Sequence, residues 1–485
     1  MKANLDTLIR DLEKIEVSRI SEVVIKGVTN DSRKIEKGHL FVAIRGDHFD
    51  GHDYIEYAIN QGAIAIVVDL DFEGDLNVGV AVIRCSNTRV AYASICSNWF
   101  NRPSEKLKVV GVTGTNGKTS VTSLLHNLFK GMGYKVGLIS TVEILIDDQH
   151  IDASMTTPDA YALHDYFNQM HSAGCSHVFM EVSSHAIDQH RVDYVDFDIA
   201  VFTNITHDHL DYHGTFKNYI KAKKGLFDKL KSDALAIINV DDVNGLVMLQ
   251  NSISRSKLFS VNSLSDCKAK IISSGADGMC ISINDRQFFT RLVGRFNVYN
   301  LLAAFAVAEE LLDLDEIVLL EHLSSIKTPK GRMELIYSKP YVLVDYAHTP
   351  DALDNVLSTI SYDYSDKLIV VIGCGGDRDK AKRPIMAKVA VRYADRVILT
   401  SDNPRSEDPI AIINDMLTGV EGENLSKIMT IVDRRLAIRT SIEIADKNDV
   451  ILIAGKGHEE YQEISGVKYH FSDQEEVRKI LSKDI

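Results

Sequence analysis

Residues 107–120 read LKVVGVTGTNGKTS, and this stretch decides the fold of the middle of the chain. Its apolar first half predicts a buried strand, and the amphipathic pattern VTSLLHNLFKGMG that comes after it predicts a helix. Between the two lie Gly111, Gly114 and Gly117, followed by Lys118, Thr119 and Ser120. Strand, glycine-rich loop, Lys-Thr pair and helix together are the setting of a phosphate-binding loop, so we expect a nucleotide-binding α/β domain.

The chemistry of this loop follows from its residue types. Glycines let backbone N–H groups converge on an anion, and the helix N-terminus adds positive potential. Lys118 can reach the terminal phosphates of ATP, and Thr119 can ligate Mg²⁺. The predicted ATP-binding residues are Gly114, Thr115, Asn116, Gly117, Lys118, Thr119 and Ser120. The match to Gly-x4-Gly-Lys-[Ser/Thr] is imperfect, because Val112 stands five positions before Gly117, so a plain glycine-rich turn is the alternative.

Short apolar runs alternate with longer helical patterns over most of the chain. The predicted strands are 40–44, 63–68, 80–83, 108–112, 178–182, 199–202, 234–238, 341–344, 368–372, 397–400 and 450–454. Many are bounded by Gly, Asp or Asn and are followed by an amphipathic stretch. This pattern is typical of α/β domains with largely parallel sheets.

Two clusters of polar and helix-breaking residues divide the chain. Residues 101–106 (NRPSEK) predict a loop, which places a first boundary between 85 and 106. Residues 327–331 (KTPKG) form the second cluster. A chain of 485 residues is too long for one hydrophobic core, so we expect three α/β units.

Composition excludes several classes of protein. Hydrophobic residues make up 45% of the chain and charged residues 25%, as in soluble globular proteins. The formal net charge of -14 disfavours nucleic-acid and membrane-surface binding. The first residues lack the apolar core of a signal peptide, and no apolar run approaches the ~20 residues of a membrane span. Six scattered cysteines without a Cys-x-x-Cys pair are typical of reduced thiols in the cytoplasm.

A second set of polar residues follows two other predicted strands. Glu181 ends one apolar strand, as the carboxylate of a Mg-nucleotide site often does. The other strand leads into 207–213, which holds His207, Asp208, His209, Asp211 and His213. Three histidines raise the alternative of zinc, but the absence of cysteine and the neighbouring carboxylates favour Mg²⁺. A solvated loop without any metal is a further alternative.

The motifs as a set resemble those of the Mur ligases. They are DSR (31–33), GTNGKT (114–119), TTPD (156–159), 180–192, TN (203–204), DHLDYHG (208–214), GRFNVYN (294–300), GRME (331–334), DYAHTPDAL (345–353), GCGGDRDKAKRP (373–384), DNPR (402–405) and GKGHE (455–459). They occur in order over essentially the whole chain. The resemblance implies a UDP-substrate-binding domain (1–87), an ATP-binding domain (88–333) and a Rossmann-like domain that binds an amino acid (334–485). It also implies that the helix at about 88–100 packs with the ATP-binding domain.

The resemblance assigns residues to a UDP-N-acetylmuramoyl-dipeptide. On the uridine side these are Asn30, Ser32, Asp47, His48 and Phe49. On the muramoyl-peptide side they are Met155, Thr156, Thr157, Ser183, Gln189 and Arg191. Hydroxyls, an amide and a guanidinium suit a ligand that carries amides and carboxylates. For Thr156 and Thr157, capping of the next helix is the alternative.

The same resemblance implies two Mg²⁺ ions. Thr119 and Glu181 hold the first, and Glu181, His209 and a carbamylated Lys223 hold the second. Within 219–227 (YIKAKKGLF) the frame Ala-Lys-x-x-Leu-Phe selects Lys223 over Lys221 and Lys224. Without the resemblance, the sequence predicts that Lys223 is a solvated lysine on the surface of a helix. Further ATP contacts by resemblance are Asn300, Arg332 and Asp345, with a local helix bond as the alternative for Asn300.

The DNPR motif indicates which amino acid is added. In the family it marks enzymes that add meso-diaminopimelate, which carries a second carboxylate at its far end. An arginine fork pairs with that carboxylate and repels the ammonium of lysine, so Arg405 is the expected specificity residue. Its expected companions are Arg378, Asp402, Asn403, Pro404, Gly455 and Glu459. A surface salt bridge is the alternative for Arg405.

We therefore expect an ATP-dependent, ADP-forming ligase of peptidoglycan synthesis. It adds meso-diaminopimelate to UDP-N-acetylmuramoyl-L-alanyl-D-glutamate through an acyl phosphate, in the cytoplasm and as a monomer. The expected catalytic residues are Lys118, Glu181, His209 and Lys223. Three alternatives remain: a lysine-adding relative, a ligase like folylpolyglutamate synthetase, and a nucleotide-binding regulator without catalysis.

Overall fold

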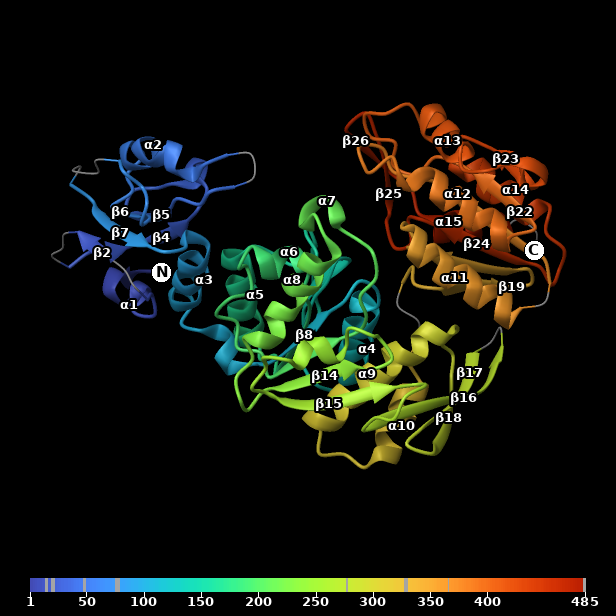
Figure 1. The fold of residues 1–485 in the computed structure, drawn as a ribbon, viewed down its shortest axis with the longest axis horizontal. Coiled ribbons are helices and arrows are strands. Elements are labelled where there is room, and N and C mark those ends of the chain that lie inside the picture. The colour runs from blue at the N-terminus through green and yellow to red at the C-terminus, as the bar shows by residue number, and fades with distance from the viewer. Residues whose placement is uncertain are drawn as a thin grey trace. The chain divides into compact units, whose positions relative to one another are not determined.

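The computed structural model describes residues 1–13, 16–18, 22–46, 49–74, 79–275, 278–326, 330–364 and 366–482. The chain forms two compact units, Met1–Leu258 and Phe259–Ile485 (Figure 1). The predicted division into three domains, with boundaries after residues 87 and 333, stays a prediction. Two of the predicted uridine-side residues, Asp47 and His48, lie outside the described residues.

The first unit begins with a five-stranded sheet of order β2-β7-β6-β5-β4. Its strands β4 to β7 are parallel, and β2 is an antiparallel edge strand. Leu40 and Val42 of β5 pack with helices α1 and α3, while Phe41 faces α2 on the other side. The bounds are β1 (Ala3–Asn4), α1 (Leu5–Ile9), β2 (Glu16–Ser18), β3 (Val24–Ile25), β4 (Gly27–Thr29), β5 (His39–Val42), α2 (Ile55–Asn60), β6 (Ala65–Asp69), β7 (Ala81–Cys85) and α3 (Thr88–Trp99).

The same unit holds a larger sheet, in which the strand order β11-β10-β9-β12-β8-β13-β14 is found. The strands from β9 to β14 in that order are parallel, and β10 and β11 form an antiparallel edge hairpin. The bounds are β8 (Lys108–Thr113), β9 (Val136–Ile139), β10 (Glu143–Ile146), β11 (Gln149–Asp152), β12 (His177–Glu181), β13 (Ile199–Phe202) and β14 (Leu235–Asn239).

Helices cover both faces of this sheet, as near-continuous apolar strands require (Figure 1). Along β12, Val178 and Met180 belong to the core that also takes in α5, α6 and α8. Phe179 points the other way and contacts Phe129 of α4, with ring centroids 4.9 Å apart. The helices are α4 (Lys118–Gly131), α5 (Ala160–Ser172), α6 (Ser184–Asp188), α7 (Leu210–His213) and α8 (Phe216–Asp228).

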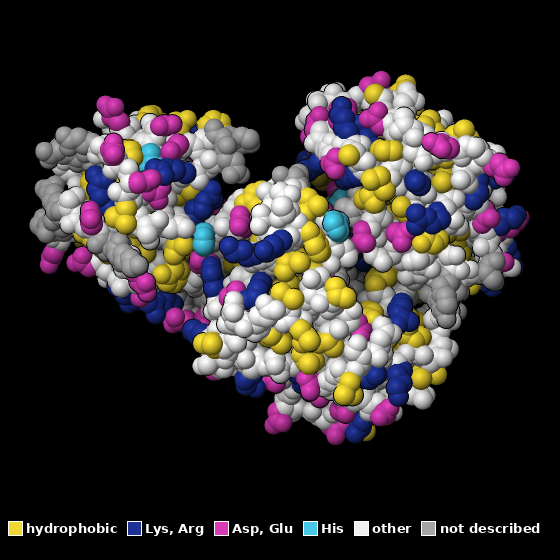
Figure 2. Space-filling model, in the orientation of Figure 1, with side chains coloured by type: hydrophobic (Ala, Val, Ile, Leu, Met, Phe, Trp, Pro, Cys, Tyr) yellow, Lys and Arg dark blue, Asp and Glu magenta, His cyan; other side chains and the backbone are white. Residues whose placement is uncertain are grey.

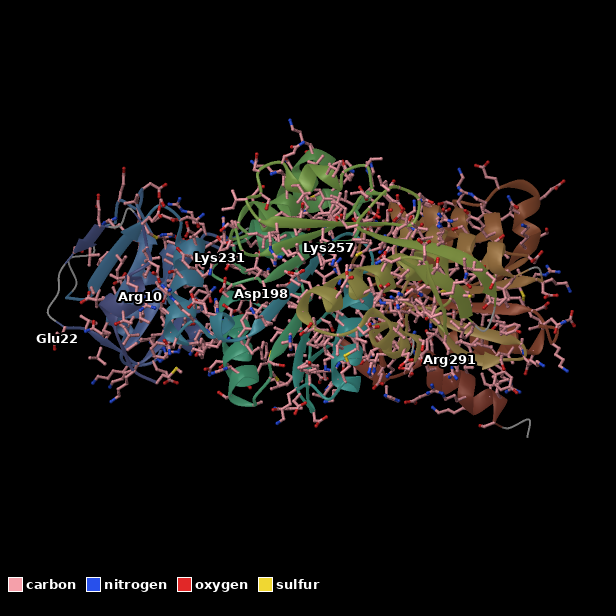
Figure 3. The ribbon with its side chains drawn as sticks, turned by 90° about the horizontal axis from the view of Figure 1, so that it is seen from below. Arg10, Glu22, Asp198, Lys231, Lys257 and Arg291 are labelled. Carbon is pink, nitrogen blue, oxygen red and sulfur yellow. The ribbon has the colours of Figure 1, made fainter. Side chains whose placement is uncertain are left out.

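One carboxylate fixes the register at the start of two central strands. Asp198, labelled in Figure 3, precedes β13 and accepts hydrogen bonds from Lys108 Nζ (2.6 Å) and from the Val109 backbone N–H (2.9 Å). With that register, Phe202 at the end of β13 lies beside Thr113 at the end of β8. The loops that follow the two strands therefore leave the sheet side by side.

The second unit begins within β15 and continues into an antiparallel meander, β16 to β18, that packs against α9 and α10. None of these three meander strands was predicted. The bounds are β15 (Arg255–Ser260), β16 (Cys267–Gly275), β17 (Gly278–Ile283), β18 (Arg286–Thr290), α9 (Arg295–Leu311) and α10 (Glu316–Ser324).

A second sheet in this unit has the order β19-β20-β24-β21-β22-β23 and is parallel except for β19. Along β24, Val450 and Leu452 pack with α11 to α13, while Ile451 and Ile453 pack with α14 and α15. Both faces are thus covered. The bounds are β19 (Glu334–Ser338), β20 (Tyr341–Asp345), α11 (Pro350–Asp363), β21 (Leu368–Ile372), α12 (Lys382–Tyr393), β22 (Arg396–Leu399), α13 (Pro409–Leu417), β23 (Ile428–Thr430), α14 (Arg434–Glu443), β24 (Val450–Ala454), β25 (Tyr461–Ile464), β26 (Val467–His470) and α15 (Asp473–Leu481).

The predicted α/β class with mostly parallel sheets is confirmed. Each of the eleven predicted strands overlaps a strand of the structure. The six cysteines are free thiols. In Figure 2, acidic and basic side chains are interspersed over the visible face. Within the part of the chain that the structure describes, no helix combines the length and apolarity that crossing a membrane needs.

Candidate active site

The phosphate-binding loop lies between the end of β8 and the start of α4. Gly117 is the residue before the helix, with a left-handed φ of 90°, and no side chain caps the first helical N–H groups. Gly114 has a φ of 156°, and a Cβ at that position would lie 1.9 Å from Thr203 Oγ1. Only glycine fits there, so the loop backbone stays close to the neighbouring strand, and the loop ends at the N-terminus of α4.

Thr203 and Asn204, directly after β13, hold this loop in place. Thr203 Oγ1 donates to the Asn116 carbonyl (2.6 Å), and Asn204 Nδ2 donates to the same oxygen (3.0 Å). Asn204 Oδ1 in turn accepts from the Asn116 N–H (2.9 Å). The pair was noted as part of a motif, but its bracing role was not predicted, because it depends on the register of β8 and β13.

Thr119 and Glu181, which were predicted to ligate the same Mg²⁺ ion, lie side by side. Thr119 Oγ1 donates to Glu181 Oε1 at 2.8 Å. The Glu181 carboxylate has no exposed surface and also accepts from the Thr141 backbone N–H (2.8 Å) and hydroxyl (3.2 Å). Thr141 was not predicted, since nothing in the sequence indicates that the loop after β9 reaches β12. The site thus gathers carboxylate and hydroxyl oxygens beside the phosphate-binding loop.

Lys223 of α8 is buried, with 1% of its surface exposed, so the reading of a solvated helix lysine is wrong. Its Nζ donates to the Gly114 carbonyl (2.7 Å) and lies 4.7 Å from the centre of the Tyr219 ring. Burial lowers the pKa of the Lys223 ammonium well below its usual range, and the nearby Lys118 cation lowers it further. The arrangement favours a neutral amine.

His209 lies close to Tyr219, the residue whose ring also contacts Lys223. Its ring centroid is 6.2 Å from that of Tyr219 and 4.9 Å from that of His185, and its backbone has a left-handed φ of 54°. Tyr219 therefore contacts both His209 and Lys223. Among the described residues, no group of three or more His, Cys, Asp or Glu side chains is arranged to hold a metal ion.

Five of the residues predicted to hold the muramoyl-peptide contact one another. Arg191 Nη1 donates to the Thr157 carbonyl (3.2 Å) and lies 3.5 Å from Met155 Sδ. Arg191 Nη2 donates to Gln189 Oε1 (2.5 Å). The Ser183 N–H donates to Thr157 Oγ1 (3.1 Å). These side chains form one polar cluster next to Glu181, whose carbonyl accepts from Thr157 Oγ1 (2.8 Å).

The helix-cap alternative for Thr156 and Thr157 is wrong. Asp159 caps α5, because its carboxylate accepts from the N–H groups of Tyr161 and Ala162. Thr156 Oγ1 instead accepts from the Thr141 hydroxyl at 3.1 Å. Both threonines therefore turn toward the surroundings of Glu181.

The uridine-side residues lie in the first sheet's loops. Asn30 and Ser32 flank Asp31, where β4 ends and the short 3-10 helix Ser32–Lys34 begins. Phe49 is 73% exposed. No contact described by the structure joins Phe49 to Asn30 or Ser32, so these assignments stay predictions.

The nucleotide residues predicted in the second unit have local partners. Asn300 Nδ2 donates to Asn297 Oδ1 within α9 (3.0 Å), which is the local bond expected as the alternative. The buried Asp345 carboxylate accepts from the N–H groups of Met333 and Ala347, both at 2.7 Å. Arg332 lies over the Tyr346 ring, 4.7 Å from its centre.

The predicted amino-acid residues meet at the carboxyl ends of β21, β22 and β24. Gly455 follows β24 with a φ of 112°, and a Cβ there would lie 2.7 Å from Asp402 Oδ2. Asn403 Nδ2 donates to Glu459 Oε2 (2.8 Å), and the Asn403 carbonyl accepts from the Gly376 N–H (2.9 Å). Ligands of open α/β sheets bind at this edge.

Arg405 is held by its backbone and by its guanidinium. It has a left-handed φ of 50°, and it forms a bridge with β25 in which its N–H donates to the Glu463 carbonyl (3.0 Å). Its Nη1 donates to the Gly376 carbonyl (2.8 Å), and its Nε lies 3.4 Å from Glu463 Oε2. The salt bridge expected as the alternative is therefore present. Pro404 precedes Arg405 in this loop, and Arg378 is exposed in the loop after β21.

Three family models cover most of the chain. "Mur ligase family, catalytic domain" matches residues 24–108, "Mur ligase middle domain" 112–308, and "Mur ligase, glutamate ligase domain" 331–457. The UDP-N-acetylmuramoyl-L-alanyl-D-glutamate–2,6-diaminopimelate ligase of Bacteroides thetaiotaomicron is 48% identical over 482 residues, which are 99% of this chain and 100% of that protein. The chain belongs to the Mur ligase family.

Solved structures agree with this Mur ligase assignment. One of a UDP-N-acetylmuramoyl-L-alanyl-D-glutamate–2,6-diaminopimelate ligase matches with a TM-score of 0.70 and 32% identity and covers 100% of both chains. That of a MurF ligase from Thermotoga maritima in complex with ADP matches with a TM-score of 0.60 and 19% identity, covering 94% of this chain and 97% of that one. The latter likeness bears on the fold alone. The predicted family of this Mur ligase is thus confirmed.

Proposed function

We propose that this Mur ligase uses ATP to join meso-diaminopimelate to UDP-N-acetylmuramoyl-L-alanyl-D-glutamate in peptidoglycan synthesis. The observation that carries the proposal is the Arg405 guanidinium, held against the Gly376 carbonyl at the carboxyl edge of the second unit's parallel sheet. A fixed guanidinium pairs in two-pronged fashion with a carboxylate, and the far end of diaminopimelate supplies one. The full-length relative at 48% identity carries the name of this reaction.

A separate observation disfavours each of the three alternative functions. L-lysine has only an ammonium at its far end, and a guanidinium repels it. A ligase of the folylpolyglutamate type has no use for the DNPR loop, and the named relative matches along the full length of the chain. A regulator without catalysis does not need the buried Lys223 or the Thr119–Glu181 pair.

The residues around Glu181 fit Mg²⁺. Glu181, Thr119 and Thr141 supply hard oxygen atoms, which this ion prefers. We assign Thr119 and Glu181 to one ion, and Glu181, His209 and a carbamylated Lys223 to a second. Carbamylation needs a neutral amine, and burial of Lys223 provides it. When bound, Mg²⁺ offsets negative charge on the transferring phosphoryl group.

The chain's own residues then bind and orient the reactants. The loop Gly114–Ser120 and Lys118 hold the phosphates of ATP, so that the γ-carboxylate of the D-glutamyl substrate attacks the γ-phosphate and forms an acyl phosphate. Arg191, Gln189 and Thr157 orient the peptide whose carboxylate reacts. Asn300, Arg332 and Asp345 contribute further contacts to the nucleotide.

The second half-reaction depends on the amino-acid pocket. Arg405, with Arg378, Asp402, Asn403, Pro404, Gly455 and Glu459, holds diaminopimelate so that its amine attacks the acyl phosphate. The intermediate collapses to the amide and phosphate, and ADP is released. Asn30, Ser32 and the residues 47–49 hold the uridine side. We also propose domains of 1–87, 88–333 and 334–485. The family models support a division into three parts, because they change between residues 108 and 112 and between residues 308 and 331.

The test is phosphate release from ATP with UDP-N-acetylmuramoyl-L-alanyl-D-glutamate, comparing meso-diaminopimelate with L-lysine. We expect turnover with diaminopimelate and little with lysine. A preference for lysine keeps the ligase and overturns the role of Arg405. No turnover with either amino acid overturns the proposed reaction.

A further inference from the structure

Lys456, in the loop after β24, has no exposed surface. Its Nζ donates to Asn403 Oδ1 and to Glu459 Oε2, both at 3.0 Å. The Tyr461 ring covers the ammonium at 5.5 Å from its centre. A buried ammonium is stable only when it is paired and hydrogen-bonded, and both of its partners here belong to the proposed amino-acid pocket.

The Asn403 amide has only one favourable orientation in this network. Its Oδ1 accepts from Lys456 and also from the Glu463 N–H (3.0 Å). Its Nδ2 donates to Glu459 Oε2 (2.8 Å). Turning the amide over would set its NH₂ group against the Lys456 ammonium and its oxygen against a carboxylate. Lys456 is therefore one of three groups, with the Glu463 N–H and the Glu459 carboxylate, that set which way the Asn403 amide faces.

Lys456 also acts on the charge of Glu459. Burial raises the pKa of the Glu459 carboxyl, and nearby Asp402 raises it too, whereas Lys456 and the Asn403 amide lower it. The other charged or titratable groups that interact with Glu459 are Tyr346, Tyr461 and Arg434. Arg434 is itself paired with the buried Asp473, at 2.7 Å. Lys456 is thus the cation in direct contact with Glu459 in the described network.

We propose that Lys456 is a positioning residue of the amino-acid site: it pairs with the Glu459 carboxylate and helps to fix the Asn403 amide, so that the pocket offers one carboxylate and one oriented amide to the incoming amino acid. This inference rests on the proposed function. Lys456 does not touch the substrate, because its ammonium is turned toward Asn403 and Glu459.

The test is Lys456→Met, which keeps the length of the side chain and removes its charge. We expect the KM for diaminopimelate to rise by about 10- to 100-fold, the range found when a group that orients a ligating residue is removed. The KM values for ATP and for the UDP-linked dipeptide should stay within about twofold, since the contacts of Lys456 lie in the amino-acid pocket. Lys427→Met is the control, because Lys427 is half-buried and its Nζ donates to the Val391 and Ala394 carbonyls, outside this pocket.

The pH profile separates positioning from a merely structural role. Removal of the Lys456 cation raises the pKa of the Glu459 carboxyl further, so the KM of Lys456→Met for diaminopimelate should fall as the pH rises from 6.5 to 9. The KM of the double variant Lys456→Met with Glu459→Gln should not follow that trend. The wild-type profile over the same range corrects for titration of the amino acid itself.

Two results overturn the inference. One is an unchanged KM for diaminopimelate in Lys456→Met, and the other is a raised KM that does not depend on pH. If Lys456→Met does not fold, Lys456→Gln takes its place in the same measurements, and the same two results overturn the inference. Failure of the proposed function is distinguishable, because it is seen as the wrong amino-acid preference, or no turnover, in the wild-type protein.

Discussion

Lys118 and Lys223 both donate to the carbonyl oxygen of Gly114, at 2.9 and 2.7 Å. One lysine lies at the start of α4 and the other in the middle of α8, a hundred residues later in the chain. Two ammonium groups on one carbonyl repel each other, which adds to the effect of burial on the pKa of Lys223. The relationship favours the neutral amine of Lys223.

Replacing Lys223 by alanine should remove nearly all ligase activity. The proposed carbamate is then lost from the metal site, and we expect kcat to fall by at least about 100-fold, as for loss of one group that stabilises developing charge. Added short-chain carboxylic acids should restore part of the activity, because they supply the missing carboxylate. Phosphate release, measured with and without the acid, checks this.

The matched control is Lys221→Ala, an exposed lysine on the same helix, which should leave activity unchanged. Full activity of Lys223→Ala without any added acid would show that Lys223 does not bridge the metal ions.

Replacing Lys118 by alanine should abolish turnover without unfolding the protein. Its ammonium bonds to two loop carbonyls, Gly114 and Thr115, and takes no part in a hydrophobic core. We expect a loss of about 10³-fold or more in kcat, as for other cations that stabilise phosphoryl transfer. Kinetics measures the loss of turnover, and circular dichroism checks that the variant stays folded.

Lys130→Ala, at the other end of α4, is the control, since Lys130 pairs with Asp147 and Asp148 instead. Near-normal turnover of Lys118→Ala would contradict the assignment of Gly114–Ser120 as a phosphate-binding loop.

Replacing Arg405 by alanine should raise the KM for diaminopimelate. A hydrogen bond to a charged group contributes about 1.5–3 kcal/mol, which corresponds to a rise of about 10- to 150-fold. The guanidinium also contacts Gly376 and Glu463, so part of the effect comes from a looser loop. Steady-state kinetics, with each substrate varied in turn, checks the expected rise in the KM for diaminopimelate.

Arg392→Ala serves as the control, because Arg392 forms an exposed pair with Asp354 in the same unit. An Arg405→Ala variant that keeps the wild-type KM for diaminopimelate would refute the specificity role.

Replacing His164 by leucine should make the protein less sensitive to acid. His164 is fully buried in α5, neither ring nitrogen has a partner, and burial lowers its pKa to about 3. Because the unfolded chain takes up a proton near pH 6.5 and the folded chain does not, the wild-type protein loses stability as the pH falls below 6.5. At pH 5 the loss from this group is about 2 kcal/mol.

Thermal unfolding of wild-type protein and His164→Leu at pH 7.5 and 5.0 measures the effect, and the advantage of the variant should grow at the lower pH. His171→Gln, an exposed position on the same helix, should show no such growth. A constant difference between His164→Leu and wild type at the two pH values would contradict the prediction.

The backbone of the nucleotide site could be predicted from sequence because its signals are local. A strand, three glycines and a Lys-Thr pair adjoin one another in 107–120, and Glu181 ends an apolar run. The environment of Lys223 could not be predicted in this way. Its burial depends on α8 packing against the loop after β8, and three lysines in four positions of one helix look alike without that packing.

The amino-acid pocket shows the same division. The DNPR loop could be recognised, but Glu463 and Lys456 could not, because their contacts with Arg405 and Asn403 join loops more than fifty residues apart in the chain. The contacts of Thr203 and Asn204 with the phosphate-binding loop, and the contact of Thr141 with Glu181, could not be predicted for the same reason. Contacts set by strand register and by packing between loops leave no periodic signal in the sequence.

The loops after β21, β22 and β24 rise from strands that are buried on both sides, and they belong to a different compact unit from the phosphate-binding loop. The loops of the amino-acid pocket can therefore change in sequence independently of the phosphate-binding loop. Exposed side chains in these loops, such as that of Arg378, can change at little cost to the strands beneath, without any change in the phosphate-binding loop. Ligases with this layout can thus change the amino acid that they add and keep the same way of activating a carboxylate.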